Sequence, residues 1–193
     1  MKELIADLRA SIAATLLLAV LCCGIYPVAV WAVGQGLYSD KSNGSLVRFN
    51  GMVVGSALIA QGFAGPAYFH PRPSAAGQGY DAVNSGGTNL GPTSKKLIED
   101  VKKRVADYRA ENGLSSDTPL PADAVTSSAS GLDPHITVRN ALLQAARVAK
   151  ARGIGEKDVM RKVEIHTEGR DLGFLGEPRV NVLMLNLDLD GRM

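Results

Sequence analysis

Two groups of residues have the types and the spacing to bind a nucleotide. The first is a glycine-rich stretch over residues 85–93, in which Ser85, Gly86, Gly87 and Asn89 are the candidate binding residues. Glycines let backbone N–H groups approach a ligand closely, and the stretch leads into a predicted helix whose N-terminus favours anions. The Gly-Lys-Ser/Thr ending of a Walker motif is absent. A loop shaped for tight turns or for protein contact is therefore the alternative.

The second group is a polar stripe on a later predicted helix, formed by Asn140, Gln144 and Arg147. Spacings of four and three residues place these side chains on one helix face. A glutamine can hydrogen-bond the edge of a base, and an arginine can bind phosphate. Gln144 and Arg147 are therefore candidate nucleotide-binding residues, and a solvated or partner-facing helix side is the alternative.

The remaining patterns predict no catalytic residue and no metal site. Residues 130–135 include Ser, Asp and His, but Asp133 is expected to cap a helix and no nucleophile elbow is present. Cys22 and Cys23 are adjacent, which is a poor geometry for a disulfide and too few ligands for zinc. No HExxH-type spacing links the three histidines, which are His70, His135 and His166.

The composition excludes two broad classes of protein. The 193 residues include 21 Lys and Arg against 19 Asp and Glu, and a net charge of +2 argues against a nucleic-acid binder. Hydrophobic residues make up 46% of the chain, which is enough for a core and argues against disorder over the whole chain.

The apolar residues are concentrated near the N-terminus. Residues 10–39 contain no charge, and the 23 residues from 11 to 33 would span roughly 35 Å as a helix, enough to cross a bilayer. A cleaved signal peptide and a buried core helix are the alternatives to a retained anchor. Pro27 is expected to kink or loosen this helix locally and to contact a protein partner there.

The predicted organisation is a single transmembrane helix followed by one soluble α+β domain, with a small, mostly antiparallel sheet covered on one face by helices. The segments are an N-terminal tail at residues 1–10, the anchor at 11–33, a linker at 34–45 and the domain at 46–193. Asn50-Gly51 predicts a hairpin turn. An aperiodic loop over residues 61–93 precedes three predicted helices: 94–112, capped by Thr93 and ended by Gly113; a second from Pro134, capped by Asp133, to Arg152; and 156–166.

The C-terminal segment, residues 179–190, is predicted to be a strand. Leucines at positions 183, 185, 187 and 189 alternate with Asn186, Asp188 and Asp190, so the leucines are expected to face the core and the polar side chains the solvent.

The long loop carries side chains typical of protein interfaces. Tyr68, Phe69, Arg72 and Tyr80 are predicted partner-contact residues, because aromatic residues and Arg are enriched there. Residues 68–93 contain no Lys, which disfavours a triphosphate site.

Several segments, read in order, resemble the KdpC family, the C subunits of the Kdp potassium-transporting P-type ATPase. The resemblance covers essentially the whole chain and is carried by residues 55–61, 68–74, 85–93, 128–136, 147–152 and 167–182. It implies an accessory, single-pass subunit in the cytoplasmic membrane, with the soluble domain on the extracytoplasmic side. The implied partners are a channel-like potassium-translocating subunit, an ATP-hydrolysing pump subunit, a small accessory subunit and the lipid bilayer.

The resemblance implies a subunit without its own catalytic motif, since the Asp-Lys-Thr-Gly phosphorylation motif of P-type pumps is absent. Two roles stay open. One is assembly and stability of the complex. The other is a catalytic chaperone that raises ATP binding by the pump subunit, with ATP shared and no cofactor of its own. Apart from the resemblance, an apolar N-terminal helix before an α+β domain is also the plan of a pilin, but no Gly-Phe processing site precedes the apolar segment.

Overall fold

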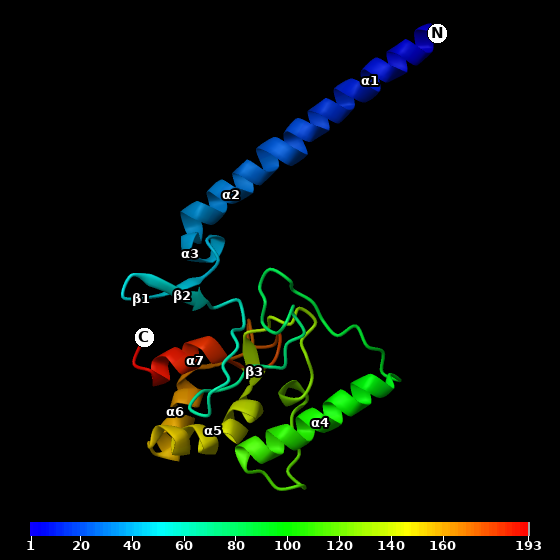
Figure 1. Ribbon diagram of the computed structural model, residues 1–193. Coiled ribbons are helices and arrows are strands. Elements are labelled where there is room, and N and C mark those ends of the chain that lie inside the picture. The colour runs from blue at the N-terminus through cyan, green and yellow to red at the C-terminus, as the bar shows by residue number, and fades with distance from the viewer. Residues whose placement is uncertain (193) are drawn as a thin grey trace. The chain divides into compact units, whose positions relative to one another are not determined.

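The computed structural model describes residues 1–192, which form two compact units, one from Met1 to Ser45 and one that begins at Leu46. The first unit is a long apolar helix followed by a short one (Figure 1). It comprises α1 (Lys2–Ala19), the π-helical η1 (Val20–Ile25), α2 (Tyr26–Leu37) and α3 (Ser39–Ser42). Within the described residues, Lys2–Leu37 is the one helix long and apolar enough to cross a membrane, with a mean hydropathy of 2.4 in its most apolar part. By length and composition, this helix confirms the prediction of a single membrane-spanning helix.

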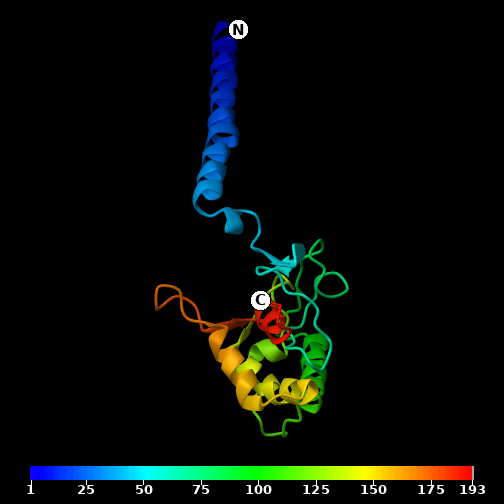
Figure 2. The same ribbon diagram turned by 90° about the vertical axis from the view of Figure 1, so that its left-hand side faces the viewer.

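Pro27 loosens the helix as expected. Proline has no N–H, so the carbonyl of Cys23, four residues earlier, loses its usual α-helical partner. The turn directly before Pro27 adopts the wider π register, in which the Tyr26 N–H donates to the carbonyl of Leu21, five residues back. The helix nevertheless continues without a break in both views (Figures 1 and 2).

The second unit combines short antiparallel strands with helices, which confirms the α+β prediction. β1 (Leu46–Phe49) and β2 (Met52–Ser56) form the predicted hairpin, and Asn50 and Gly51 have φ of 49° and 78°. β3 (His135–Thr137), β4 (Thr167–Glu168) and β5 (Arg179–Asn181) form an antiparallel sheet in the order β3-β5-β4. The helical elements are α4 (Lys95–Asn112), η2 (Ala122–Ala124), α5 (Val138–Arg152), α6 (Glu156–Ile165) and α7 (Val182–Leu189).

The core lies where α5, α6 and α7 meet the three-stranded sheet. Its members are fully or almost fully buried: Phe69, Ile136, Ala141, Ala145, Val148, Ala149, Val159, Val163, Val180, Val182 and Leu185. Small residues on α5 let α6 approach closely, and α5 also packs against α4. Phe69 comes from the long loop, so this core includes a segment without regular structure.

The predicted strand over residues 179–190 is wrong beyond Asn181. The Asn181 side chain accepts a hydrogen bond from the Met184 N–H and caps α7, which runs to Leu189. Leu183, Leu185 and Leu187 are buried as expected, but Asn186 is buried with them. A short helix buried on nearly all sides places every second residue in the core as readily as a strand does, so alternation could not distinguish the two.

Two predicted helix starts are also corrected. α5 begins at Val138, because His135–Thr137 pairs with β5 and Thr137 then caps the helix. Ser94, and not Thr93, caps α4. The predicted ends are confirmed, since Gly113 and Gly153 stop α4 and α5 in the left-handed conformation, with φ of 64° and 67°.

Candidate functional site

Residues 57–94, all of them described, form neither helix nor strand, yet part of this loop is held like a strand in a sheet. The Phe69 N–H donates to Asn186 Oδ1 at 2.8 Å, and Asn186 Nδ2 donates to the Phe69 carbonyl at 2.9 Å. Gln144 does the same for the next residue, accepting from the His70 N–H at 2.7 Å and donating to the His70 carbonyl at 3.1 Å. Two side-chain amides, which we call the amide clamp, thus replace a neighbouring strand.

A chain of buried polar groups orients the clamp. Gln144 Nε2 donates to Asn140 Oδ1 at 2.9 Å, and Asn140 Nδ2 donates to Asp123 Oδ2 at 2.9 Å. The Tyr108 hydroxyl also donates to Asn140 Oδ1, at 2.7 Å. Burial, together with the nearby Asp123 carboxylate, raises the pKa of Tyr108, so its hydroxyl stays a donor. The network fixes which way each amide points, and therefore which backbone groups it can bind.

Two arginines hold the carbonyls on the N-terminal side of the clamped residues. Arg147 Nη1 donates to the carbonyls of Pro66 at 2.7 Å and Tyr68 at 3.0 Å. Arg152 Nε donates to the Ala67 carbonyl at 2.6 Å, and its guanidinium lies 5.0 Å above the Tyr68 ring. Burial lowers the pKa of Arg147, partly offset by Glu111, but an arginine stays charged under ordinary conditions. These residues fix five consecutive residues, 66–70, to α5 and α7.

The predicted nucleotide stripe is therefore part of the internal framework. Gln144 is 1% exposed, and its Oε1 also accepts from Arg147 Nη2 at 2.8 Å. Arg147 Nε donates to Asn112 Oδ1 at 3.0 Å. The polar stripe was expected to face solvent, a partner or a ligand. Instead Asn140 and Gln144 are buried, because an aperiodic loop covers that face of α5.

The predicted partner-contact residues of the loop also bond within the fold. Phe69 is 0% exposed and belongs to the core, so its side chain offers no surface to a partner in this structure. Arg72 Nη1 donates to Asp133 Oδ2 at 2.9 Å, and the Tyr80 hydroxyl donates to the Arg72 carbonyl at 2.9 Å. The Tyr68 hydroxyl donates to Asp190 at 3.3 Å. Tyr68, Arg72 and Tyr80 are half-buried, so only part of each side chain is open to solvent.

The glycine-rich stretch packs against the turn before β3. The Gly86 N–H and the Ser85 hydroxyl both donate to the Ser130 carbonyl, at 2.9 and 3.0 Å. A Cβ on Gly87 would lie 2.8 Å from the Ala129 carbonyl oxygen, which explains the glycine by close backbone approach. Asn89 has φ of 52° and is exposed. Ser85, Gly86 and Gly87 thus serve to hold the glycine-rich stretch against residues 129–130.

Asp133 does not cap a helix, contrary to prediction. Its Oδ1 accepts from the His135 N–H at 3.0 Å, and its Oδ2 binds Arg72. Burial alone would raise the pKa of Asp133, but hydrogen bonds from His135 and Arg72 outweigh it and lower the pKa to about 2. Asp133 therefore carries a negative charge that joins the loop to the start of β3.

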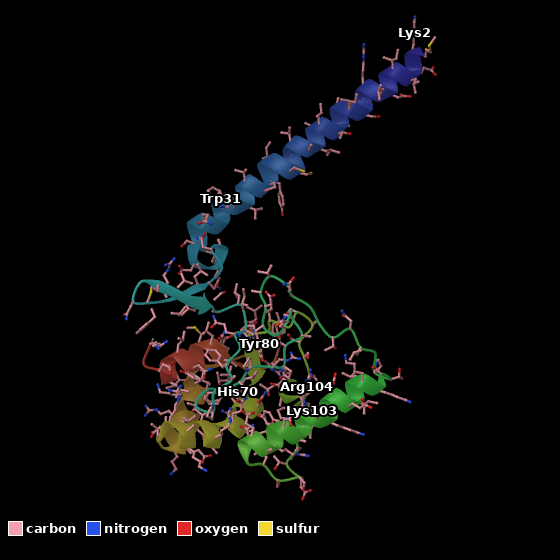
Figure 3. The ribbon with its side chains drawn as sticks, in the orientation of Figure 1. Lys2, Trp31, His70, Tyr80, Lys103 and Arg104 are labelled. Carbon is pink, nitrogen blue, oxygen red and sulfur yellow. The ribbon has the colours of Figure 1, made fainter. Side chains whose placement is uncertain are left out.

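A cavity of about 410 Å³ opens beside the clamp, between the loop and α4. His70, Tyr80 and Arg104, labelled in Figure 3, line it together with Glu111. His70 Nδ1 lies 3.1 Å from Glu111 Oε1, and His70 Nε2 lies 3.0 Å from the Gly65 carbonyl. Both ring nitrogens face acceptors, so only a protonated imidazole can donate to both. Within residues 1–192, no three His, Cys, Asp or Glu side chains gather as a metal site would require.

A second feature, for which the sequence predicts no site, is the connection between β4 and β5. We call residues 168–179 the arm; Figure 2 shows it in orange, projecting from the body of the second unit. Leu172, Phe174 and Leu175 are 82%, 69% and 49% exposed. An isolated antiparallel bridge between Asp171 and Leu175 closes its tip. The signal in the sequence was the run Leu172-Gly173-Phe174-Leu175-Gly176, which is apolar and flanked by charged residues.

Comparison with known proteins gives the family. A family model described as "K+-transporting ATPase, c chain" matches residues 8–191. The chain belongs to the KdpC family. It is 52% identical over 190 residues to a potassium-transporting ATPase KdpC subunit of Koribacter versatilis, covering 98% of this chain and 95% of that one. It is 58% identical over 166 residues to that of Mycobacterium tuberculosis (86% and 88%), and 57% identical over 183 residues to that of Nitratidesulfovibrio vulgaris (94% and 92%).

The KdpC family model covers most of the apolar helix, the clamp and the arm. The resemblance noted from the sequence is confirmed. Membership of the KdpC family together with the apolar helix indicates a membrane-anchored protein.

Proposed function

We propose that this chain is an accessory subunit of a potassium-transporting ATPase, required for assembly and stability of the complex and without catalytic residues or a metal site of its own. Its partners are a channel-like potassium-translocating subunit, an ATP-hydrolysing pump subunit and a small accessory subunit. Residues 11–33 anchor it once in the cytoplasmic membrane, and the unit that begins at Leu46 lies on the extracytoplasmic side. The KdpC subunits among its relatives support the transporter assignment.

The observation that favours assembly over nucleotide binding is the use of Gln144 and Arg147 inside the fold. Gln144 donates twice and accepts twice, and Arg147 donates from all three of its nitrogens to protein groups. Gln144 has no unused donor or acceptor, so contacting a base would break bonds that hold His70. Arg147 keeps one unused N–H on Nη2, but turning its Nη1 towards a phosphate would break its bonds to the carbonyls of Pro66 and Tyr68. Each such bond left unmade in the interior costs about 1–3 kcal/mol, which would be subtracted from nucleotide affinity.

The second candidate is the catalytic chaperone, in which ATP is shared with the pump subunit. Its best remaining support is the exposed side of the glycine-rich stretch, where Asn89 presents its amide from a left-handed backbone. That amide could donate to a phosphate without disturbing the clamp. The two roles therefore differ in which residues a variant should target.

Co-expression of the complete complex tests the proposal. We expect that omitting this chain lowers the recovery of the other subunits as one complex, and that Asn89→Gly, which keeps the positive φ, leaves assembly and the ATP concentration for half-maximal turnover unchanged. Undiminished recovery without the chain would contradict the assembly role. Normal assembly with a several-fold weaker ATP dependence for Asn89→Gly would favour the chaperone role.

Sidedness is tested by protease protection. In sealed inside-out vesicles the unit that begins at Leu46 should resist added protease, and in spheroplasts it should be digested. Digestion in inside-out vesicles would place the unit on the cytoplasmic side, where ATP is available.

A further inference from the structure

We propose that the arm, residues 168–179, is a preformed apolar plug that inserts into a concave apolar pocket with a basic rim on a companion protein subunit. This rests on the proposed function, because it assumes that the chain works within a complex. The arm is distinct from residues 68–80, where the sequence placed the partner contacts.

The exposure of the tip is built into the backbone. Leu172 has φ of 54°, although a left-handed backbone disfavours a leucine, and Gly173 and Gly176 have φ of 82° and 79°. A strained residue of this kind persists only where the surrounding structure enforces it, and such residues cluster at functional sites. In this conformation the Leu172 side chain is 82% exposed.

Hydrogen bonds make the tip rigid before any partner arrives. The Asp171 N–H donates to the Leu175 carbonyl at 2.9 Å, and the Leu175 N–H donates back to the Asp171 carbonyl at 2.9 Å. The Gly173 N–H donates to the Arg170 carbonyl at 3.1 Å. A preorganised loop loses little conformational entropy on binding, which raises its affinity for a matching surface.

The charges at the base of the arm argue for a protein partner over a lipid surface. Arg170 binds both oxygens of Glu177, at 2.8 and 3.0 Å, and Arg179 binds Glu168 at 3.0 Å and Asp171 at 3.4 Å. Three carboxylates face two guanidiniums, so the base carries a surplus negative charge and its cations are already paired. Apolar segments that bind bilayers usually carry free Lys and Arg for anionic headgroups.

The surplus negative charge at the base of the arm indicates which charge the rim of the partner's pocket should carry. A protein surface with an apolar centre for Phe174 and one or more basic residues around it would complement both the tip and the base. Arm-into-pocket contacts between copies of this chain would join different surfaces, and they would close as a ring or a reciprocal exchange of arms, or repeat as an open chain. Because the proposed function gives the chain partners within one transporter, the occupant we assign is a different subunit of that transporter, and a contact between copies is an outcome that the crosslinking below detects.

The test uses the complete complex and the full chain. Leu172→Gly with Phe174→Ser removes two apolar side chains, and glycine relieves the strained backbone, so the fold should be preserved. Val83→Ser is the matched control, because Val83 is 90% exposed but lies on the long loop. We expect at least about tenfold less of the other subunits to co-purify with the arm variant, because losing a buried aromatic anchor weakens protein interfaces by this much. Normal amounts should co-purify with the control.

Photocrosslinking identifies the occupant. With a photoreactive phenylalanine analogue in place of Phe174, a crosslink to an identified companion subunit supports the proposal. A crosslink to lipid, a crosslink to a second copy, or no crosslink in the assembled complex overturns it.

The two proposals fail in different ways. If the wild-type chain recovers no other subunit, the proposed function is wrong and the arm proposal falls with it. If the wild-type chain and the arm variant recover the other subunits equally, the arm proposal alone is wrong. Circular dichroism of each purified full-length variant checks that the loss of recovery is not a loss of fold.

Discussion

Replacing Asn186 with alanine should destabilise the second unit far more than the loss of one surface amide would. Asn186 binds both the N–H and the carbonyl of Phe69, and Phe69 is 0% exposed. After the substitution both backbone groups stay buried without a partner. Each such group costs about 1–3 kcal/mol, so the expected loss of unfolding free energy is about 2–6 kcal/mol.

Urea unfolding of the full-length chain in detergent, followed by far-UV circular dichroism, measures this loss. Tryptophan fluorescence is unsuitable, because Trp31, the chain's single tryptophan, lies in the apolar helix α2 (Figure 3). Met184→Ala is the control, since Met184 lies on the same helix but is only half-buried. We expect the control to lose less than about 1.5 kcal/mol.

A loss of under about 1 kcal/mol for Asn186→Ala, or a loss equal to that of Met184→Ala, would refute the clamp. A further check is the combination with Gln144→Ala. Because the two amides hold adjacent residues of one segment, their effects should not add, and a coupling of about 0.5–3 kcal/mol is expected. Simple additivity would mean that the two amides act on independent parts of the fold.

Two further predictions concern the core and acid stability. Leu185→Asp should cost more than about 3 kcal/mol in the same assay, because Leu185 is 0% exposed and a carboxylate there has no partner; a smaller loss would mean that α7 is not buried as described. Because the pKa of Asp133 is lowered to about 2 on folding, its contribution is present above about pH 4 and is lost as the pH falls through about 2. Between about pH 4 and pH 2 the unfolding free energy of the wild type should therefore fall by up to about 2 kcal/mol more than that of Asp133→Asn. Parallel plots of unfolding free energy against pH for the two proteins would contradict this.

Local signals in the sequence predicted the local structure well. Asn50-Gly51 specified the hairpin, and Gly113 and Gly153 specified the ends of α4 and α5, because each depends only on a residue that tolerates a positive φ. The apolar helix followed in the same way from an uninterrupted run without charges. These features need no knowledge of what the segment packs against.

Features set by distant contacts were mispredicted. Asn186 lies 117 residues from Phe69 in the sequence, and Gln144 lies 74 residues from His70. A polar side chain on a helix normally indicates a solvated face, and nothing in an aperiodic loop reveals that its backbone will cover that face. The error over residues 182–189 has the same origin, since the clamp requires Asn186 to point inward among the leucines.

The contrast between the long loop and the arm bears on which of them a partner can use. The backbone of residues 66–70 is hydrogen-bonded to the side chains of Asn186, Gln144, Arg147 and Arg152. A partner that changed the conformation of these residues would first have to break those bonds. Glu168 also lies 3.7 Å from His135 Nε2, but the other ion pairs of the arm join its own residues to one another. The arm leaves Leu172, Phe174 and Leu175 exposed. Binding at its tip removes apolar surface from water and breaks none of the bonds that hold the fold. Aromatic side chains therefore stabilise the fold in residues 66–80, whereas Phe174 in residues 168–179 is exposed and available for recognition.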